Sequence, residues 1–290
     1  MKMSATIATP LELSEGQRTA LINLLADDDP NVYQPVRERI LASGPTACDW
    51  LRPHALSSDP VLRRHAHEII RRFDQQTTDN HFLSFCLRHG DDFDIEEAAW
   101  LLARTQYPEI NVEAYQALLD SYARDLRERI EPEADARQIL ASINTYLFSE
   151  LGFSGNEKHY YDPDNSFLNR VLDRRTGNPI NLCLVYMLLG RRMRLPIAGV
   201  ALPGHFICRY QSAHDELYID VFNGGRLLTK TDCVHHLLKI NSELRENDLT
   251  PVNARRMMTR VCGNLHQIYR YLELTDESTR FQRYLVALGR

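Results

Sequence analysis

A histidine and an aspartate, each in a short predicted strand, are the residues of this chain best suited to chemistry. His205 opens the segment HFICRY, and Asp220 lies near the end of ELYIDVF. Since one antiparallel hairpin spans the interval between them, we expect the two side chains to lie next to each other. A carboxylate beside an imidazole fixes the tautomer of the ring and raises its basicity. Alternatively, His205 is a hydrogen-bonded structural histidine and Asp220 caps a turn.

Such a pair would serve a nucleophile at the start of the preceding helix, where free N–H groups and the helix dipole favour a thiolate or an oxyanion. Asn178 and Pro179 predict that this helix begins there. Proline has neither a thiol nor a backbone N–H, so position 179 cannot supply the nucleophile. Cys183 lies one helical turn further along, among apolar neighbours that keep a thiol protonated. We predict that Cys183 is a small core residue; a nucleophilic Cys183 is the alternative.

The elements that must position these residues follow from periodicity. An apolar segment over residues 180–193 predicts a buried helix, and amphipathic patterns predict further helices. Short segments rich in β-branched and aromatic residues, separated by turns, predict three strands. The expected helices cover 95–103, 111–130, 135–152, 254–274 and 277–288, and the expected strands cover 197–202, 205–210 and 216–222. The fold class is therefore α+β and predominantly helical.

Six segments of the chain are informative when they are considered together. In chain order they read EEAAWLLARTQYPEINVEAY, YLFSELGFSGN, YYDPDNSFLNRVLDRRTGNPINLCLVY, LPGHFICRY, IDVFNGGRLLT and RRMMTRVCGNLHQIY. Together they resemble the bacterial SirB-type transglutaminase-like/TPR proteins, from about Phe93 to the C-terminus. The resemblance implies a papain-like core, with one helix packed on a small antiparallel sheet and TPR-like helices after it.

In active members of the wider superfamily, the helix begins Gly-x-Cys, and a histidine and an aspartate follow from two strands. The resemblance assigns Gly177, His205 and Asp220 to these positions, and it places Pro179 where the cysteine would be. SirB-type proteins also tend to read Gly-x-Pro here, so the proline looks like a family trait. The resemblance therefore implies a fold more directly than an activity.

The N-terminal part of the chain contains two Asp-Pro pairs, Asp29-Pro30 and Asp59-Pro60. Aspartate is a good N-cap and proline suits the first helical position, so each pair predicts a helix start. Their regular spacing predicts two HEAT-like helical hairpins; two unrelated capped helices are the alternative. We divide the chain into a HEAT-like region over residues 1–90, a transglutaminase-like domain over 91–235 and a TPR-like helical pair over 236–290.

Composition argues against several classes of partner. Hydrophobic residues make up 43% of the chain and charged residues 25%, with a formal net charge of −5 and a pI near 6.1. Basic residues form scattered pairs rather than a stripe, so we do not expect nucleic acid as a partner. The N-terminus lacks the apolar stretch of a signal peptide, and Leu182–Leu189 is too short to span a bilayer, so we expect a cytoplasmic protein without a membrane partner.

No metal or cofactor is expected. The six cysteines are far apart and form no C-x-x-C pair, which argues against a zinc or redox site and fits a reducing compartment. Neither His235 with His236 nor His65 with His67 has a spacing that lets one ion bind both rings of a helix. Asn223-Gly224-Gly225 reads as a turn, since the spacing of a nucleotide-binding loop is absent.

Two functions from different classes fit these observations. The first is a catalytically inactive transglutaminase-like protein that recognises another protein or a peptide. The second is a cysteine-dependent acyl transferase or amide hydrolase, with Cys183 as nucleophile, His205 as base and Asp220 as orienting residue. A third, water activation by the His–Asp pair alone, ranks last. Four residues before the helix either line a groove beside His205 or form a structural turn: Tyr160, Tyr161, Asn165 and Arg175.

Overall fold

The computed structural model of the protein describes residues 13–240 and 249–290. It forms two compact units. The first contains Met1–Asn80 and Thr105–Pro108, and the second contains His81–Arg104 and Glu109–Arg290. Each unit has its own buried apolar side chains, so each is described separately.

The first unit is helical. Its helices are α1 (Glu15–Leu25), α2 (Pro30–Ala42), α3 (Ala47–Leu51), a 3-10 turn (Arg52–Leu56) and the first part of α4 (Pro60–Arg88). The Asp29 carboxylate accepts a hydrogen bond from the Asn31 N–H at 2.9 Å, and the Asp59 carboxylate accepts one from the Val61 N–H at 2.8 Å. Helices α2 and α4 therefore start where the Asp-Pro pairs predict. Their assignment to HEAT-like repeats stays a prediction.

Helix α4 is one continuous element of 29 residues. Neither glycine nor proline occurs between Val61 and Arg88, so nothing in the covalent structure stops the helix. The first unit packs around a cluster of apolar side chains from its helices. It comprises Leu25, Val36, Ile40, Ala47, Cys48, Leu51, Leu62, Ile69 and Phe73.

The second unit contains the predicted α+β core. Its helices before the sheet are α5 (Ile95–Gln106), α6 (Val112–Arg129), α7 (Ala136–Asn144), α8 (Leu168–Arg174) and α9 (Pro179–Arg192). A π-helical turn (Thr145–Glu150) follows α7, and the chain leaves it at Gly152, whose φ of +75° suits glycine. Helix α9 is buried along nearly its whole length and is the central helix of the unit.

Four antiparallel strands form the sheet in the order β3 (Ile197–Leu202), β4 (His205–Gln211), β5 (Glu216–Asp220) and β6 (Arg226–Leu228). The three predicted strands are thus confirmed, and β6 is an addition that the short segment RLL did not reveal. A tight turn at Gly224 and Gly225 joins β5 to β6, and the φ values of +69° and +75° explain the glycines.

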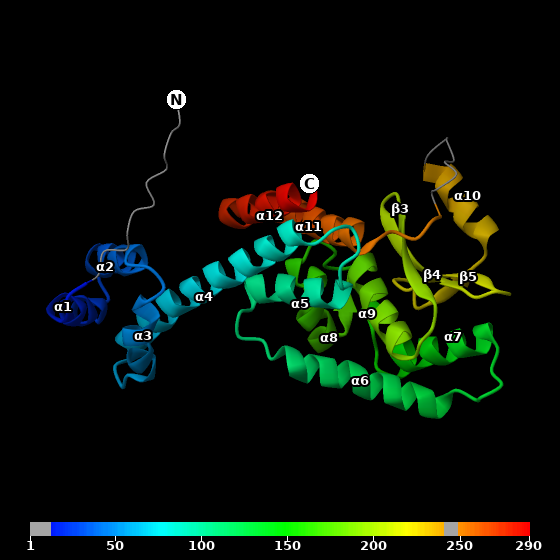
Figure 1. The fold of residues 1–290 in the computed structure, drawn as a ribbon, viewed down its shortest axis with the longest axis horizontal. Coiled ribbons are helices and arrows are strands. Elements are labelled where there is room, and N and C mark those ends of the chain that lie inside the picture. The colour runs from blue at the N-terminus through cyan, green and yellow to red at the C-terminus, as the bar shows by residue number, and fades with distance from the viewer. Residues whose placement is uncertain (1–12, 241–248) are drawn as a thin grey trace. The chain divides into compact units, whose positions relative to one another are not determined.

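The two faces of the sheet pack against different helices (Figure 1). On one face, the Cys208 thiol of β4 lies 3.6 Å from the carbonyl oxygen of Cys183 in α9. On the other face, Ile207 and Tyr218 pack with Cys233 and Leu237 of α10 (Lys230–Ile240). Because successive strand residues point to opposite faces, this packing fixes the direction of each side chain in β4.

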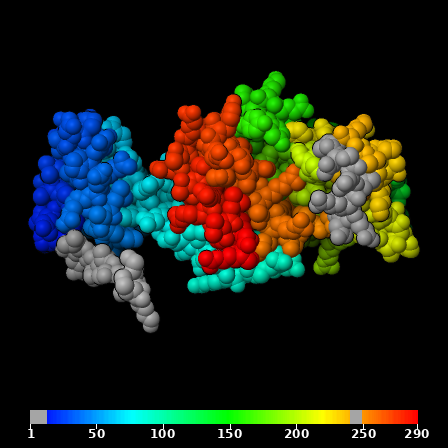
Figure 2. All heavy atoms as spheres, turned by 90° about the horizontal axis from the view of Figure 1, so that it is seen from above, coloured from blue at the N-terminus to red at the C-terminus, as the bar shows by residue number. Residues whose placement is uncertain are grey.

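Helices α11 (Ala254–Tyr271) and α12 (Thr275–Leu288) form a hairpin on the surface of the second unit (Figures 1 and 2). The buried Arg255 guanidinium fastens this hairpin by donating to the carbonyl oxygens of Leu288 and Cys86, both at 2.9 Å. The predicted helical pair is confirmed, while its TPR-like character stays a prediction. Among the described residues, no helix combines the length and apolar character that a bilayer crossing requires.

Candidate functional site

The structure brings His205 and Asp220 into direct contact. The Nε2 atom of His205 lies 2.8 Å from Oδ1 of Asp220, and both side chains are more than four-fifths buried. The Asn223 side-chain amide donates to the other carboxylate oxygen at 2.8 Å. Burial alone would raise the pKa of Asp220, but the hydrogen bonds from His205 and Asn223 outweigh it and lower that pKa below its ordinary value. The carboxylate therefore stays ionised and orients the ring.

Side chains cap the start of α9. Pro179 occupies the first helical position, and the side-chain Oδ1 of Asn178 accepts a hydrogen bond from the Asn181 N–H at 3.0 Å. The Asn178 amide group donates to the Ser166 hydroxyl at 2.8 Å, inside the protein. The cap thus uses one of the N–H groups that would otherwise be free at this helix start. Nothing at position 179 can act as a nucleophile.

Phe222 links the histidine to the region of this helix start. Its ring centre is 6.1 Å from that of His205, in an edge-to-face arrangement. The same ring packs so tightly on Gly155 that a Cβ atom there would lie 2.6 Å from it. Gly155 pairs with Gly177 in the two-residue parallel strands β1 (Ser154–Gly155) and β2 (Thr176–Gly177), immediately before α9. Apart from the position of Phe222 after β5, no feature of the sequence predicts this role.

Cys183 lies on a different surface of the sheet from the imidazole. It is fully buried, and its thiol donates to the carbonyl oxygen of Phe206 at 3.5 Å. Burial raises the pKa of the Cys183 thiol well above its ordinary value, and the neighbouring Cys208 thiol adds to this effect. His205 extends from the face of the sheet that α10 covers, where its ring centre is 6.2 Å from that of His236. The surroundings of Cys183 are those of a core residue.

The four residues expected either in a groove or in a turn separate into two groups. Asn165 is fully buried and donates to the carbonyl oxygen of His159 at 2.8 Å, so it holds the loop before α8. Arg175 has a φ of +53° and donates to the carbonyl oxygen of Leu151, which makes it part of a turn. Tyr160 and Tyr161 instead lie on the surface, with exposed fractions of 39% and 61%.

These tyrosines belong to a continuous series of rings that reaches His205. Each ring centre is between 5.4 and 6.2 Å from the next. We call this series the aromatic row; in order, it comprises Tyr271, Tyr161, Tyr160, Phe222, His205 and His236. One end is strongly exposed, since Tyr271 is 75% accessible, and the row leads from α11 to the His–Asp pair.

Arg260 of α11 is a further partly buried residue of this unit. Its guanidinium carbon lies 5.7 Å from the centre of the Phe206 ring in β4. Sequence reasoning missed Arg260, although a signal was present. It stands three residues after Met257 and next to Val261, both core residues, so it occupies the edge of the apolar stripe of an amphipathic helix.

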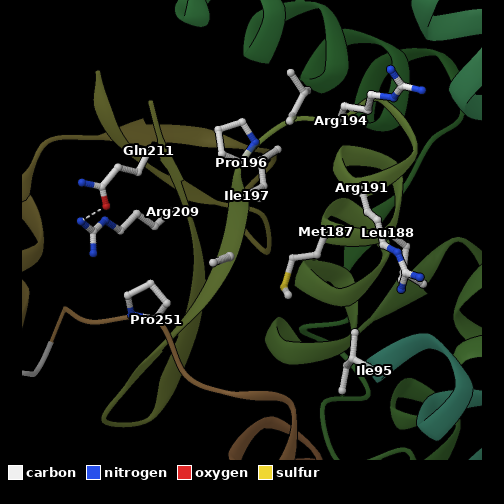
Figure 3. A pocket seen from close by; sticks show the side chains of 12 residues that line it. Ile95, Met187, Leu188, Arg191, Arg194, Pro196, Ile197, Arg209, Gln211 and Pro251 are labelled. Carbon is white, nitrogen blue, oxygen red and sulfur yellow. Dashed lines mark hydrogen bonds between the residues drawn. The ribbon is translucent and has the colours of Figure 1, made fainter. Parts of the chain in front are cut away.

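A separate cavity of about 630 Å³ lies between the C-terminal end of α9 and strands β3 and β4 (Figure 3). Met187, Ile197 and Pro251 contribute apolar surface to it, whereas the charged ends of Arg191 and Arg194 point away from its centre. None of the described residues around it is a cysteine, histidine, aspartate or glutamate, so it offers no acid, base or thiol. Within the described ranges, no three such side chains are placed to share a metal ion.

Residues 113–263 match the family model of the transglutaminase-like superfamily, Transglut_core2. The chain belongs to this superfamily. It is also 36% identical to the UPF0162 protein of Xylella fastidiosa strain 9a5c over 188 residues, which are 63% of this chain and 67% of that relative. Protein SirB1 of Salmonella typhimurium is 28% identical over 102 residues, covering 35% of this chain and 38% of SirB1. The resemblance to SirB-type proteins is thereby confirmed.

Part of this chain is also similar to part of a longer protein. F-box only protein 21 of Homo sapiens is 34% identical over 136 residues, which are 44% of this chain but 21% of that protein. The shared segment is therefore a minor part of a longer chain there. No solved structure matches this chain.

Proposed function

We propose that this protein is a catalytically inactive transglutaminase-like protein that binds a segment of another protein. The observation that carries the proposal is Pro179 at the start of α9, where a nucleophilic cysteine would need to stand. Proline provides no sulfur, and the buried Cys183 thiol is held in the protein core with a raised pKa. Acyl transfer through a thioester requires a thiolate that a substrate can reach.

The aromatic row supports a binding role. Tyr160, Tyr161 and Tyr271 are exposed and adjacent, and tyrosine supplies contact area and a hydrogen-bonding hydroxyl at little entropic cost. Exposed aromatic clusters of this kind mark interaction sites on protein surfaces. The similarity to one portion of F-box only protein 21 fits a module that functions within larger assemblies.

The retained His205–Asp220 contact favours one alternative, a cysteine-dependent acyl transferase or amide hydrolase that uses Cys183. In that case, His205, acting as the base, would need to reach the Cys183 thiol on the opposite face of the sheet. A rearrangement of β4 or α9 would have to precede every turnover, because β4 lies between the two groups in the folded protein.

An activity assay distinguishes the two functions. The purified chain is incubated with dimethylcasein and dansylcadaverine, which report transamidation, and with fluorogenic peptide amides, which report hydrolysis. We expect no turnover above that of heat-unfolded protein, and no change after iodoacetamide treatment or in Cys183→Ser. Turnover that disappears in Cys183→Ser but persists in Cys208→Ser would establish the enzyme and overturn the proposal.

A binding assay tests the second part of the proposal, that the protein binds a segment of another protein. Arrays of immobilised 15-residue peptides are probed with the wild-type chain, with Tyr161→Ala/Tyr271→Ala and with Leu56→Ala, a control at an exposed apolar residue of the first unit. We expect a set of peptides that the wild type and the control retain and the double variant loses. Identical retention by all three proteins would contradict a binding role for the aromatic row.

A further inference from the structure

A groove on the second unit runs between the C-terminal part of α4 and helix α12 (Figure 1). Its volume is about 390 Å³, and all of its lining residues belong to the second unit. Leu83 and Leu87 of α4 and Val286 and Ala287 of α12 give it an apolar surface. Leu87 and Val286 are 53% and 61% exposed, so two large apolar side chains of the groove face solvent. Among the described residues, none of the aromatic row lines this groove.

The floor of the groove is rigid, because α4 and α12 are joined beneath it. Phe82 and Tyr284 are fully buried, and their ring centres are 4.8 Å apart in an edge-to-face contact. The Arg255 guanidinium donates to the carbonyl oxygens of Leu288 and Cys86, which holds the ends of the two helices together. The groove is therefore formed before a ligand arrives, and a ligand does not have to order its walls.

The spacing of the lining residues fits a helical ligand. Leu83 and Leu87 are one turn apart on α4, whereas Arg283, Val286 and Arg290 follow one another on a single face of α12. At 1.5 Å per residue, the groove follows the two helices for roughly 6–10 Å. A groove between two packed helices accepts the side-chain ridge of a third helix, which inserts apolar residues at helical spacing.

The charge of the groove specifies the polar residues of this ligand. Arg283 and Arg290 line it, and no aspartate or glutamate does so among the described residues. Within residues 13–240 and 249–290, neither guanidinium forms an ion pair with a carboxylate of the chain. The groove is thus locally positive on a chain whose formal net charge is −5. Carboxylates beside the apolar stripe of a ligand would complement it.

The same features argue against two other occupants. A two-fold contact with a second copy would place this positive groove against itself, and like charges would repel each other. A bilayer surface is flat on the scale of a protein groove, so it would touch the rims of the groove but leave its apolar floor uncovered. A separate helix is convex and fits the concave surface.

We propose that the groove binds an amphipathic helix of another protein. In this complex, the apolar side chains of the helix pack on Leu87 and Val286, and its carboxylates pair with Arg283 and Arg290. These carboxylates lie about two helical turns apart on the partner, because the two arginines are separated by about 10 Å along α12. The groove is a second interaction surface, and its ligand is independent of the function proposed for the aromatic row.

Synthetic helices test the proposal on the full chain. The probes are acetylated and amidated peptides of about 18 residues with a leucine stripe at helical spacing. The positions beside the stripe are all glutamate, all glutamine or all lysine, and a fourth peptide is the glutamate version with a central proline, which breaks the helix. Binding is followed by the fluorescence anisotropy of the labelled peptides.

The wild-type chain should prefer the acidic helix. We expect the glutamate peptide to bind about 3–30-fold more tightly than the glutamine peptide, as two surface ion pairs would give. The difference should shrink in about 0.5 M NaCl, because salt screens exposed charges. The proline peptide should bind at least about 10-fold more weakly than the glutamate peptide, because it cannot form the helix that fits the groove.

Variants at exposed positions separate recognition from folding. Val286→Glu places a carboxylate in the groove and should lower affinity for the glutamate peptide by at least about 10-fold, whereas Leu56→Glu in the first unit should leave it unchanged. Arg283→Glu should reverse the preference, so that the lysine peptide binds more tightly than the glutamate peptide. Arg256→Glu, the same charge change outside the groove on α11, should retain the wild-type preference. A misfolded groove would bind neither peptide, so a reversal reports direct pairing.

Several results would overturn the proposal. Equal binding of the glutamate and glutamine peptides to the wild type at low salt would remove the charge recognition, and binding of neither would remove the helix site. Sedimentation of the chain alone and flotation with vesicles of phosphatidylglycerol and phosphatidylcholine in equal parts test the other occupants. Self-association or vesicle binding that Val286→Glu abolishes would assign the groove to a second copy or to a membrane surface instead.

Discussion

The Cys183 thiol and the His205 imidazole lie on opposite faces of the four-stranded sheet. The thiol approaches β4 from α9 and donates to the Phe206 carbonyl oxygen, whereas the imidazole shares its face with Ile207, against α10. Strand alternation alone produces this separation, because residues 205 and 206 must point in opposite directions. A histidine one position further along β4 would face the thiol, so the separation depends on the register of a single strand.

The thiols of the folded chain should be unreactive. All six cysteines are buried, and burial raises the pKa of Cys86 to about 11 and that of Cys233 to about 12. We expect no stoichiometric reaction with Ellman's reagent at pH 8 over minutes, and six thiols per chain in concentrated guanidinium chloride. One fast-reacting thiol in the native protein, assigned to Cys183 by mass spectrometry, would contradict its role as a core residue.

Replacement of the proline should create the missing thiol. In Pro179→Cys, the new sulfur would stand at the first position of α9, where the helix dipole stabilises a thiolate. We expect iodoacetamide to label the new residue with half-maximal rate at a pH below about 8.5, the ordinary pKa of cysteine. Mass spectrometry of the labelled peptide gives the rate at each pH. Wild-type protein is the control, and the same peptide should stay unlabelled there.

This variant also tests the distance to the imidazole. If His205 reaches position 179, the double variant Pro179→Cys/His205→Asn should be labelled more slowly below pH 7 than the single variant. Equal rates in the two proteins would show that the His–Asp pair and the helix start are too far apart for proton transfer.

Asp220 should make the stability of the protein depend on acid pH. Its pKa is below the ordinary 3.8 in the folded state, so its contribution is present above that value and disappears as the pH falls through the lower, folded value. At pH 7, Asp220→Asn should lower the free energy of unfolding by about 1–3 kcal/mol, because a buried hydrogen-bonded charge is lost. Urea denaturation at pH 7 and at pH 3 measures the difference, which should shrink in acid.

Glu157→Gln is the matched control for this measurement. It removes the same charge from an exposed residue on the nearby loop and should change the free energy of unfolding by less than about 0.5 kcal/mol. A wild-type advantage over Asp220→Asn that stayed constant down to pH 2 would show that folding does not lower the pKa of Asp220.

The contact of Phe222 with Gly155 should be intolerant of a side chain at position 155. In Gly155→Ala, the new Cβ would lie 2.6 Å from the Phe222 ring, so we expect a loss of about 1–3 kcal/mol in the free energy of unfolding. Gly155→Ala combined with Phe222→Leu should cost less than the sum of the single changes, since the smaller side chain relieves the clash. Urea denaturation of the four proteins gives the coupling.

Gly263→Ala provides the control for the alanine itself. Gly263 lies inside α11 with no atom within 4 Å of its Cβ position, so this change should raise the free energy of unfolding by about 0.5–1 kcal/mol. If the changes in the free energy of unfolding caused by Gly155→Ala and Phe222→Leu were strictly additive, the Phe222 ring would not be packed against position 155 of β1.

The sequence by itself determined the local elements and the superfamily. Asp-Pro pairs, apolar periodicity and β-branched segments act within a few residues, so the starts of α2, α4 and α9 and the positions of β3, β4 and β5 were predictable. The consequence of Pro179 was predictable in the same way, because a proline has neither a nucleophilic group nor a backbone N–H wherever the helix lies. Local signals did not predict β6, because a strand of three residues is too short to show a periodic pattern.

Only the tertiary structure decided which distant residues meet. The aromatic row joins rings from α11, the loop before α8, the turn after β5, β4 and α10, and no spacing in the chain encodes that association. The face of β4 that carries His205 depends on which helix packs on which side of the sheet. Such long-range contacts are fixed by packing of the whole core rather than by any segment alone.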